Sequence, residues 1–285
     1  MKVALIGYGY WGHILEKYVN KNYDYQLKYI CDSRSDLNEV WQDKEIEAVL
    51  IATRNEQRFP IIKDALLNHK HVLAEKPLAL SLAEADYLSK LAEEKQCQLV
   101  VDYSFTVSKS LRLAQLFVVH GDIGCLKGFE MTANHLAPFG GGSVYWILGS
   151  HMLSILDMFI PLRYLSFTKH DIVKFDSVET GTILTDKGKI NLSLNYPEKI
   201  LEVVLYGSKG TIVYNPHKRD TLVVNNYERP IWVRGENITQ NIQKYQYDEA
   251  NNVKDILEYF NDVVEGKAKS NIRLGVKITE ILENI

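Results

Sequence analysis

A glycine-rich segment near the start of the chain, Gly7-Tyr8-Gly9-Tyr10-Trp11-Gly12, limits what this sequence can fold into. An apolar run over residues 2–6 precedes it, and a helical pattern over residues 11–20 follows it. In this setting the first glycine permits a tight turn, the second lets the backbone approach a pyrophosphate, and the third lets helix and strand pack closely. The start of the helix adds N–H donors and a positive dipole end. The segment predicts a dinucleotide-binding loop; the alternative is a glycine-rich turn without a ligand.

A second apolar run, residues 26–31, ends in an acid at the position where such a loop needs one. Asp32 lies about 20 residues beyond the third glycine, where an acid binds the ribose hydroxyls and repels a 2′-phosphate. Asp32 therefore favours NAD as the cofactor. Ser33 and Arg34 follow directly, and an arginine there is able to hold a 2′-phosphate, so NADP stays open.

Residues 1–105 alternate short apolar runs with longer amphipathic ones. Runs that are apolar on both faces and separated by helices predict a parallel sheet with covered faces, the doubly wound α/β arrangement of a Rossmann domain. Between Asp32 and Ala48 there is room for a single short helix, around residues 37–42, so we expect a sheet that is trimmed on that edge. The expected strands are 2–6, 26–31, 48–52, 72–74 and 99–101, and the other expected helices are 11–20, 59–68 and 82–94.

Residues 106–285 have a different pattern, in which consecutive strands are joined by tight turns. Short turns between consecutive strands predict an antiparallel sheet. We expect an α+β C-terminal domain with an open, mainly antiparallel sheet and helices on one face. Its expected strands are 127–135, 164–170, 178–185, 189–196, 200–206, 211–214 and 221–224, and its expected helices are 107–120, 143–159, 253–265 and 274–284.

Composition and charge exclude several classes of partner. The formal net charge is -3, which provides no basic field for nucleic acid or an anionic membrane. No apolar stretch approaches the roughly 18 residues of a spanning helix, and the start lacks the pattern of a secretory leader, so we expect a cytoplasmic protein. The three cysteines are not at metal or redox spacing. His69 and His71 flank the start of a strand with no third ligand nearby, so no metal is expected.

The segment Glu75-Lys76-Pro77 follows the strand expected at residues 72–74. Because the carboxyl ends of parallel strands line the ligand crevice, Lys76 is expected beside the nicotinamide. A lysine there is able to polarise a carbonyl or stabilise a developing alkoxide during hydride transfer. Taken alone, however, Glu75 and Lys76 indicate only a surface ion pair before a helix.

Several segments occur in an order that resembles the glucose–fructose oxidoreductase / inositol dehydrogenase / MocA (Gfo/Idh/MocA) family. The likeness runs nearly end to end, and the Glu-Lys-Pro segment is its most specific element. The amino-acid sequence of the phosphate loop is similar to that of family members that act on nucleotide-linked sugars. The matching segments are residues 7–12, Ala52-Thr53-Arg54-Asn55, residues 71–78, Asp122-Ile123-Gly124, and the stretch from Gly141-Gly142-Ser143 through Gly149-Ser150-His151.

The resemblance implies a role for each segment. Thr53 and Asn55 are expected along the cofactor, Glu75 and Lys76 at the nicotinamide ribose and the reaction centre, and His151 as the general acid/base. The second domain is expected to bind the substrate, and its exposed sheet to join subunits into a homodimer or homotetramer. The expected catalytic residues are Lys76 and His151, and the expected cofactor-binding residues are Gly7, Tyr8, Gly9, Tyr10, Trp11, Gly12, Asp32, Ser33, Arg34, Thr53, Asn55, Glu75 and Lys76.

The chain departs from the family pattern in its second domain. The family usually carries Asp-x-Gly-x-His on the helix of His151, and here Ile147 replaces the aspartate. Residues four apart lie on one face of an α-helix, and isoleucine accepts no hydrogen bond. Losing a hydrogen bond to a charged group costs about 1.5–3 kcal/mol, which is about ten- to hundred-fold in rate.

Three further positions differ from the family. Arg54 and Arg58 stand where proline and histidine are common, and are expected either to contact an anionic ligand or to be solvated. The stretch Asp102-Tyr103-Ser104-Phe105 replaces a histidine-containing segment. Tyr103 is there either an alternative proton donor or a half-buried residue of the domain junction.

The leading functional hypothesis is an NAD(P)-dependent dehydrogenase or reductase acting on the CH–OH group of a sugar, a cyclitol or a nucleotide-linked sugar. Lys76 would polarise the oxygen and His151 would move the proton. The alternative is a non-catalytic dinucleotide-binding sensor, which Ile147, the trimmed first domain and the altered tyrosine segment at residues 102–105 favour. Lys76 and His151 favour the enzyme, since a sensor needs neither. An enzyme acting on a non-sugar carbonyl or imine is a third possibility, because the fold does not decide the substrate.

Overall fold

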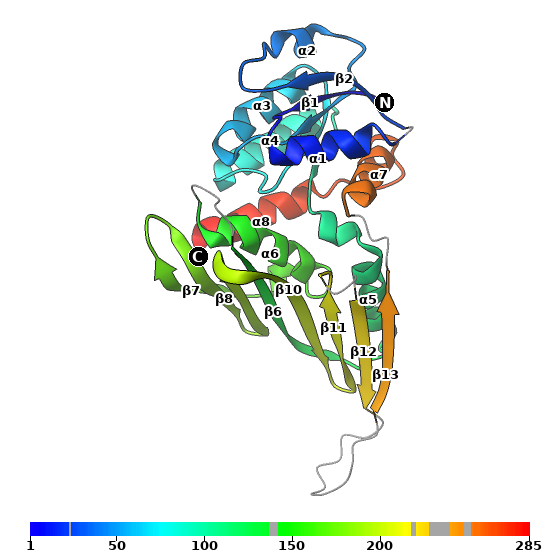
Figure 1. Cartoon of the computed structure of the whole chain (residues 1–285), viewed down its shortest axis with the longest axis vertical. Helices are drawn as coiled ribbons and strands as arrows, with labels where there is room; N and C mark the ends of the chain where they lie inside the picture. The colour runs from blue at the N-terminus through cyan, green and yellow to red at the C-terminus, as the bar shows by residue number, and fades with distance from the viewer. Residues whose placement is uncertain (23, 137–141, 218–220, 228–239, 248–251) are drawn as a thin grey trace, which may run out of the picture. The chain divides into compact units, whose positions relative to one another are not determined.

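A computed structural model describes residues 1–22, 24–136, 142–217, 221–227, 240–247 and 252–285, and the chain divides into two compact units (Figure 1). The first unit joins residues 1–104 to the last two helices of the chain, and the second is formed by residues between 105 and 250. Each unit is described by itself.

The first unit is built on a parallel sheet with the strand order β2-β1-β3-β4-β5. β3 is buried along its whole length, and β1 and β4 nearly so, as their apolar runs predict. β2 alternates exposed and half-buried residues because it forms the trimmed edge that was expected. The strands are β1 Lys2–Ile6, β2 Gln26–Cys31, β3 Ala48–Ile51, β4 His71–Ala74 and β5 Leu99–Val101, and the helices between them are α1 Tyr10–Val19, α2 Asn38–Gln42, α3 Asn55–Leu67 and α4 Leu82–Glu94.

The strand order fixes where a ligand is expected. The chain passes from β1 to β2 on one side and then to β3 on the other side of β1. In a doubly wound sheet this reversal opens a crevice at the carboxyl ends of the two strands. The phosphate loop follows β1, and Thr53 follows β3, so both lie at this edge.

The two final helices, α7 Asn252–Val264 and α8 Ile272–Asn284, pack in the first unit and not, as expected, in the second. The Tyr25 hydroxyl donates to the Leu257 carbonyl at 2.6 Å, and the amide of Asn271 exchanges hydrogen bonds of 2.7 and 2.8 Å with the backbone of Val101 on β5. The Asn271 amide thus satisfies backbone groups on the open edge of β5. The sequence shows that α7 and α8 have an apolar face, but not which layer that face covers.

The second unit contains a sheet with the order β13-β12-β11-β10-β6-β9-β8-β7 among the described residues. It is antiparallel except where β6 pairs with β9, as the mainly antiparallel prediction requires. β13 was not expected from the sequence. The strands are β6 Leu126–Leu136, β7 Phe167–Lys174, β8 Val178–Thr185, β9 Gly188–Ser193, β10 Asn195–Gly207, β11 Gly210–Asn215, β12 Thr221–Tyr227 and β13 Gln240–Gln246.

Helical segments pack against one face of this sheet, as expected. Met131, Ile190 and Leu205 are buried on that face. The opposite face carries polar residues, including Glu130 and Lys189, whose side chains form an ion pair of 3.1 Å. The helical segments are the 3₁₀ turn Ser104–Val107, α5 Lys109–His120, the π-helical turn η2 Tyr145–Gly149, α6 Ser150–Asp157 and the 3₁₀ turn Leu162–Tyr164.

Other expectations from composition concern single residues and helix lengths. Cys31 and Cys97 are buried, Cys125 is exposed, and all three are free thiols. Within the described ranges no helix is long and apolar enough to cross a bilayer. The same ranges hold no group of three or more histidine, cysteine, aspartate or glutamate side chains arranged to bind a metal.

Candidate dinucleotide site

The glycines of the phosphate loop differ in the space around them. Gly7 has a φ of +96°, and a Cβ there would lie 2.7 Å from the backbone of Ala52. A Cβ on Gly12 would lie 2.2 Å from the Gly7 carbonyl oxygen, so the loop and α1 meet too closely for any side chain. Gly9, the residue before α1, has nothing within 4 Å of its ideal Cβ position. The backbone at the start of α1 therefore faces open space, which is the cradle that a pyrophosphate needs.

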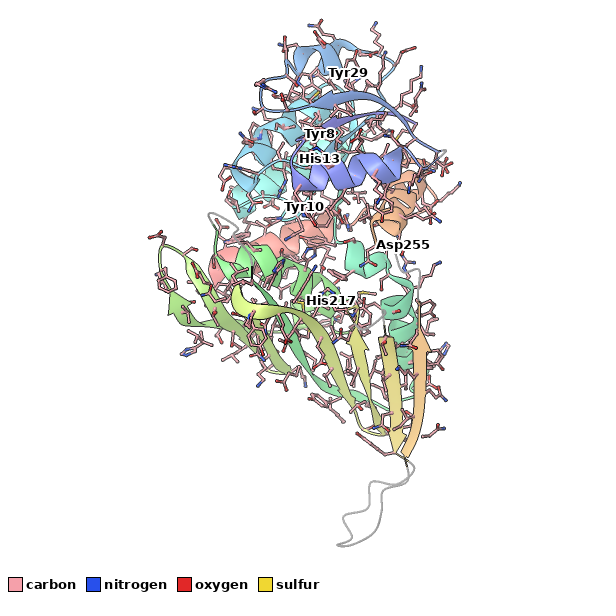
Figure 2. All side chains as sticks on the ribbon, viewed as in Figure 1. Tyr8, Tyr10, His13, Tyr29, His217 and Asp255 are labelled. Atoms are coloured by element: carbon pink, nitrogen blue, oxygen red, sulfur yellow. The ribbon has the colours of Figure 1, made fainter. Side chains whose placement is uncertain are left out.

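The aromatic residues of the loop fall into two groups. The Tyr8 ring stacks on His13 with centroids 4.0 Å apart, and its hydroxyl donates to Glu16 Oε2 at 2.6 Å. This hydrogen bond raises the pKa of Tyr8. Tyr10 and Trp11 are 78% and 44% exposed, and Figure 2 labels Tyr8, Tyr10 and His13 near the start of α1. Tyr8 therefore braces the loop against α1, whereas Tyr10 and Trp11 present their rings to solvent.

Asp32 stands directly after β2, as the sequence predicts. Its carboxylate accepts from the Arg34 backbone N–H at 2.8 Å and from Arg34 Nη2 at 2.9 Å. These contacts lower the pKa of Asp32, so the group is an anion at neutral pH. Ser33 is exposed, and the Arg34 side chain is 89% exposed. The structure thus joins Asp32 and Arg34, the acid expected at the ribose and the guanidinium able to hold a 2′-phosphate, in one ion pair.

Thr53 and Asn55 lie at the carboxyl end of β3. The Thr53 Oγ1 atom is buried and has no hydrogen-bond partner, and buried polar atoms are otherwise satisfied in most proteins. Asn55 opens α3, after Arg54, which is exposed. An orphaned hydroxyl beside an open phosphate cradle and a ribose-binding acid fits a nicotinamide dinucleotide. The loop at residues 7–12, Asp32 and Thr53 would hold its pyrophosphate and sugars.

A cluster of buried charged residues lies at the neighbouring strand ends. β4 pairs with β5 through Ala74 and Val101, so the residues that follow, Glu75 and Asp102, stand side by side. Glu75 is 9% exposed and Asp102 7% exposed. The Lys76 backbone N–H donates to Glu75 Oε2 at 3.3 Å. The sequence predicted Glu75 and Lys76 at this edge but gave no role to Asp102, which only the strand register identifies.

Arg58, on α3, is buried and holds the backbone around this cluster. It is 3% exposed, and it donates to the Pro77 carbonyl at 2.7 Å and to the Thr53 carbonyl at 2.8 Å. Burial lowers its pKa, an effect that Glu75 opposes. The expectation of a ligand-binding or solvated Arg58 is therefore wrong, because its guanidinium ties the segment after β4 to the segment after β3.

Burial dominates the ionisation of the cluster. It lowers the pKa of Lys76 to about 8, against the opposing effect of Glu75. Burial, together with the charge of the Glu75 carboxyl, raises the pKa of Asp102 to about 8. It also raises the pKa of Glu75, while Lys76 and Arg58 lower it. Tyr103 is fully buried and its pKa is raised, so it is poorly suited to be a proton donor at neutral pH.

His151 lies on α6 in the second unit, and its ring meets the Phe105 ring edge-on at 5.3 Å. Residues 145–149 form a π-helical turn and not part of a regular α-helix. The expected one-turn relation between Ile147 and His151 stays a prediction. The role of His151 in proton transfer stays a prediction.

Comparison with known proteins bears on the first unit most directly. Residues 28–103 match the family model described as an oxidoreductase family with an NAD-binding Rossmann fold. Over these residues the chain is similar to the Gfo/Idh/MocA family. Relatives of this family include the scyllo-inositol 2-dehydrogenase (NADP(+)) IolW of Bacillus subtilis. It is 24% identical over 255 residues, which span 78% of this chain and 67% of the relative.

Other relatives match over shorter stretches. Uncharacterized oxidoreductases of Synechocystis and Bacillus subtilis are 32% and 34% identical, and the chain spans only 26% and 23% of their lengths. Among solved structures, the 3-ketoreductase KijD10 of Actinomadura kijaniata, in complex with TDP-benzene and NADP, has a TM-score of 0.83 at 17% identity. That likeness covers 100% of this chain and 96% of the other. GenD2 from gentamicin A biosynthesis, in complex with NAD, has a TM-score of 0.82 at 18% identity and covers 99% and 92%. These likenesses show the two-domain fold of Gfo/Idh/MocA oxidoreductases.

Proposed function

We propose that this chain is an NAD(P)-dependent dehydrogenase or reductase that transfers a hydride between nicotinamide and a secondary alcohol or ketone. The observation that carries the proposal is the half-buried Lys76, which follows β4 at the edge where the phosphate cradle opens. A lysine with its pKa lowered to about 8 is still mainly an ammonium at neutral pH, as polarisation of a carbonyl oxygen requires.

Each residue of the site then has a task. The nicotinamide, when bound, supplies or accepts the hydride. The loop at residues 7–12 binds the pyrophosphate, and Asp32 binds the adenosine ribose. The Lys76 ammonium holds the substrate oxygen and stabilises the negative charge that develops on it. We assign His151 the role of general acid/base on the substrate, in agreement with its position in the family.

A sugar-like substrate is the best supported class. IolW is named as an inositol dehydrogenase, and KijD10 as a 3-ketoreductase that binds a TDP compound. A sugar, a cyclitol or a nucleotide-linked sugar all offer the secondary carbinol that the proposed chemistry needs. The rival function, a dinucleotide-binding sensor, is favoured by the replacement of the family aspartate by Ile147, by the trimmed first domain and by the altered tyrosine segment at residues 102–105.

The experiment that tests the proposal starts with binding and ends with turnover. Titration with NADH and NADPH, followed by energy transfer from tryptophan to the reduced nicotinamide, is expected to show binding, with NADH preferred if Asp32 dominates and NADPH if Arg34 dominates. A screen of polyols and nucleotide-linked sugars should then give turnover that Lys76→Ala abolishes while cofactor binding persists. Binding without turnover on any substrate would support the sensor, and binding of neither dinucleotide would refute both.

We also propose that the chain forms a homodimer or homotetramer through the open face of the sheet in its second unit. The face is broad, and it carries Tyr206 at 41% and Leu184 at 42% exposure among its polar residues. Light scattering tests this directly, and a purely monomeric protein at micromolar concentration would contradict it.

A further inference from the structure

Two buried carboxyl groups stand in contact at the carboxyl ends of β4 and β5. The pairing of Ala74 with Val101 sets Glu75 beside Asp102, close enough for each carboxyl group to shift the pKa of the other. Neither group is more than 9% exposed. The hydride-transfer role proposed above uses Lys76 and leaves this pair without a task.

Two neighbouring carboxyl groups in a buried site do not both ionise at the same pH, because their negative charges repel each other. One of the two groups therefore keeps its proton to a higher pH. Asp102 accepts hydrogen bonds from the Ser104 backbone N–H at 3.1 Å and from the Ser104 hydroxyl, which favour its anion. Burial and the charge of Glu75 outweigh these donors and raise the pKa of Asp102 to about 8.

The other charged groups around the pair set its total charge. Lys76, which follows Glu75, and Arg58, on α3, both favour ionisation of Glu75. Arg58 is held by the Pro77 and Thr53 carbonyls. Tyr103 follows Asp102 and stays neutral, because burial raises its pKa. The Glu75–Asp102 pair, with a single negative charge, thus lies near the cationic side chains of Lys76 and Arg58. A further positive charge at this edge of the sheet would favour loss of the proton that the pair still holds.

We propose that Glu75 and Asp102 share one proton, and that the pair releases this proton when a positively charged nicotinamide binds at the same edge of the sheet. This inference rests on the proposed function, which places the nicotinamide beside Glu75 and Lys76. Asp102 acts through Glu75 and is a positioning residue. Release of the proton offsets the incoming positive charge, so the net charge buried at this edge stays nearly constant when NAD⁺ binds. NADH carries no charge on its nicotinamide and leaves the proton in place.

Calorimetric titration counts the protons. NAD⁺ and NADH are titrated into the full-length protein at about pH 7, in two buffers that differ in ionisation enthalpy. We expect the wild type to release close to one proton per NAD⁺ bound and none per NADH. Asp102→Asn and Glu75→Gln each keep the size and polarity of the side chain but remove the shared proton. Both variants are expected to bind NAD⁺ without this release.

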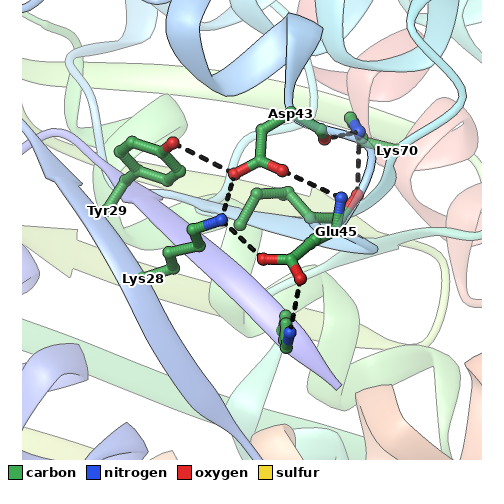
Figure 3. Close-up of polar contacts among 7 residues, drawn as sticks. Lys28, Tyr29, Asp43, Glu45 and Lys70 are labelled. Carbon is green, nitrogen blue, oxygen red and sulfur yellow. Dashed lines mark hydrogen bonds and ion pairs between the residues drawn. The ribbon is translucent and has the colours of Figure 1, made fainter.

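A matched control changes a carboxylate at the opposite edge of the sheet. Asp43 precedes β3 and is paired with Lys28 at 2.6 Å in the polar cluster of Figure 3, where Tyr29 also donates to it. These contacts lower the pKa of Asp43 to about 2, so it holds no proton to release at neutral pH. Asp43→Asn should therefore release the same proton as the wild type.

The outcomes separate this inference from the proposed function. Binding of both dinucleotides with no proton release on NAD⁺ would overturn the shared proton and leave the oxidoreductase intact. Undiminished release in Asp102→Asn would assign the proton to Lys76, whose pKa is also lowered to about 8, and would equally overturn the inference. Binding of neither dinucleotide would overturn both proposals.

Infrared spectroscopy gives a second measurement that needs no ligand. The difference spectrum between the wild type and Asp102→Asn should contain a protonated-carboxyl band at about pH 7 that disappears by about pH 10. Absence of that band at neutral pH would refute the shared proton independently of any binding result.

Discussion

Replacing Gly9 by alanine should separate dinucleotide binding from folding. The ideal Cβ position of Gly9 meets no atom within 4 Å, and its φ of -95° and ψ of -157° lie in the extended region that alanine adopts. Alanine is a poorer residue than glycine before a helix, which costs a few tenths to about 1 kcal/mol. It also restricts the unfolded chain, which stabilises by about 0.4–1 kcal/mol. The two effects nearly cancel, so the unfolding free energy should change by less than about 1 kcal/mol.

The effect of Gly9→Ala on binding should be much larger. Its methyl group would occupy the open space that the pyrophosphate needs at the start of α1. Loss of a hydrogen bond to a charged group costs about 1.5–3 kcal/mol, so the Kd for NADH should rise by about ten- to hundred-fold for each N–H that no longer reaches the phosphate. The assay is the NADH fluorescence titration, with urea unfolding of the same preparation.

Gly12→Ala is the matched comparison, because it makes the same chemical change three residues away in a crowded place. Its Cβ would lie 2.2 Å from the Gly7 carbonyl oxygen, so α1 must move away from the loop. Such overpacking costs about 1–3 kcal/mol, and binding should fall together with stability. The reasoning is refuted if Gly9→Ala binds NADH as tightly as the wild type, or if it unfolds as early as Gly12→Ala.

Two further predictions concern charge and packing. Because burial lowers the pKa of Lys76 to about 8, the ammonium that polarises the ketone predominates below that pH, and the rate of reduction should fall as the pH rises through about 8. Initial rates between about pH 6 and pH 10 check this, and a flat profile would exclude that role for the Lys76 ammonium. The Tyr25 hydroxyl donates a hydrogen bond to the Leu257 carbonyl on α7, so Tyr25→Phe should lower the unfolding free energy by about 1 kcal/mol in a urea titration. The affinity for NADH should not change, and a loss of affinity would show that this contact shapes the site.

Local patterns were sufficient for most of the first unit and for the phosphate loop. Gly7, Gly9 and Gly12 lie between a buried strand and the first turn of a helix. Both the spacing of the glycines and the apolar periodicity around them are patterns of neighbouring residues, so the sequence alone predicts the loop. Asp32 could be predicted for the same reason, since it ends the next strand. The mainly antiparallel sheet of the second unit followed from its short turns, although β13 was missed.

The family pattern extended these predictions to Thr53, Asn55, Glu75 and His151, which carry no local signal of their own. It did not reveal the π-helical turn at residues 145–149, because a sequence with α-helical periodicity does not disclose an inserted i→i+5 bond.

Tertiary structure alone decided the rest of the candidate site. Glu75 and Asp102 are brought together by the register of β4 and β5, and Arg58 reaches the Thr53 and Pro77 carbonyls only because α3 packs beside both strand ends. The packing of α7 and α8 in the first unit was likewise invisible, since an amphipathic helix shows that it has a partner but not which one. The sequence by itself determined the elements and the phosphate loop, because both depend on residues close together in the chain. The buried charges and their pKa values depend on contacts between distant segments and on burial, and only the folded structure supplies those.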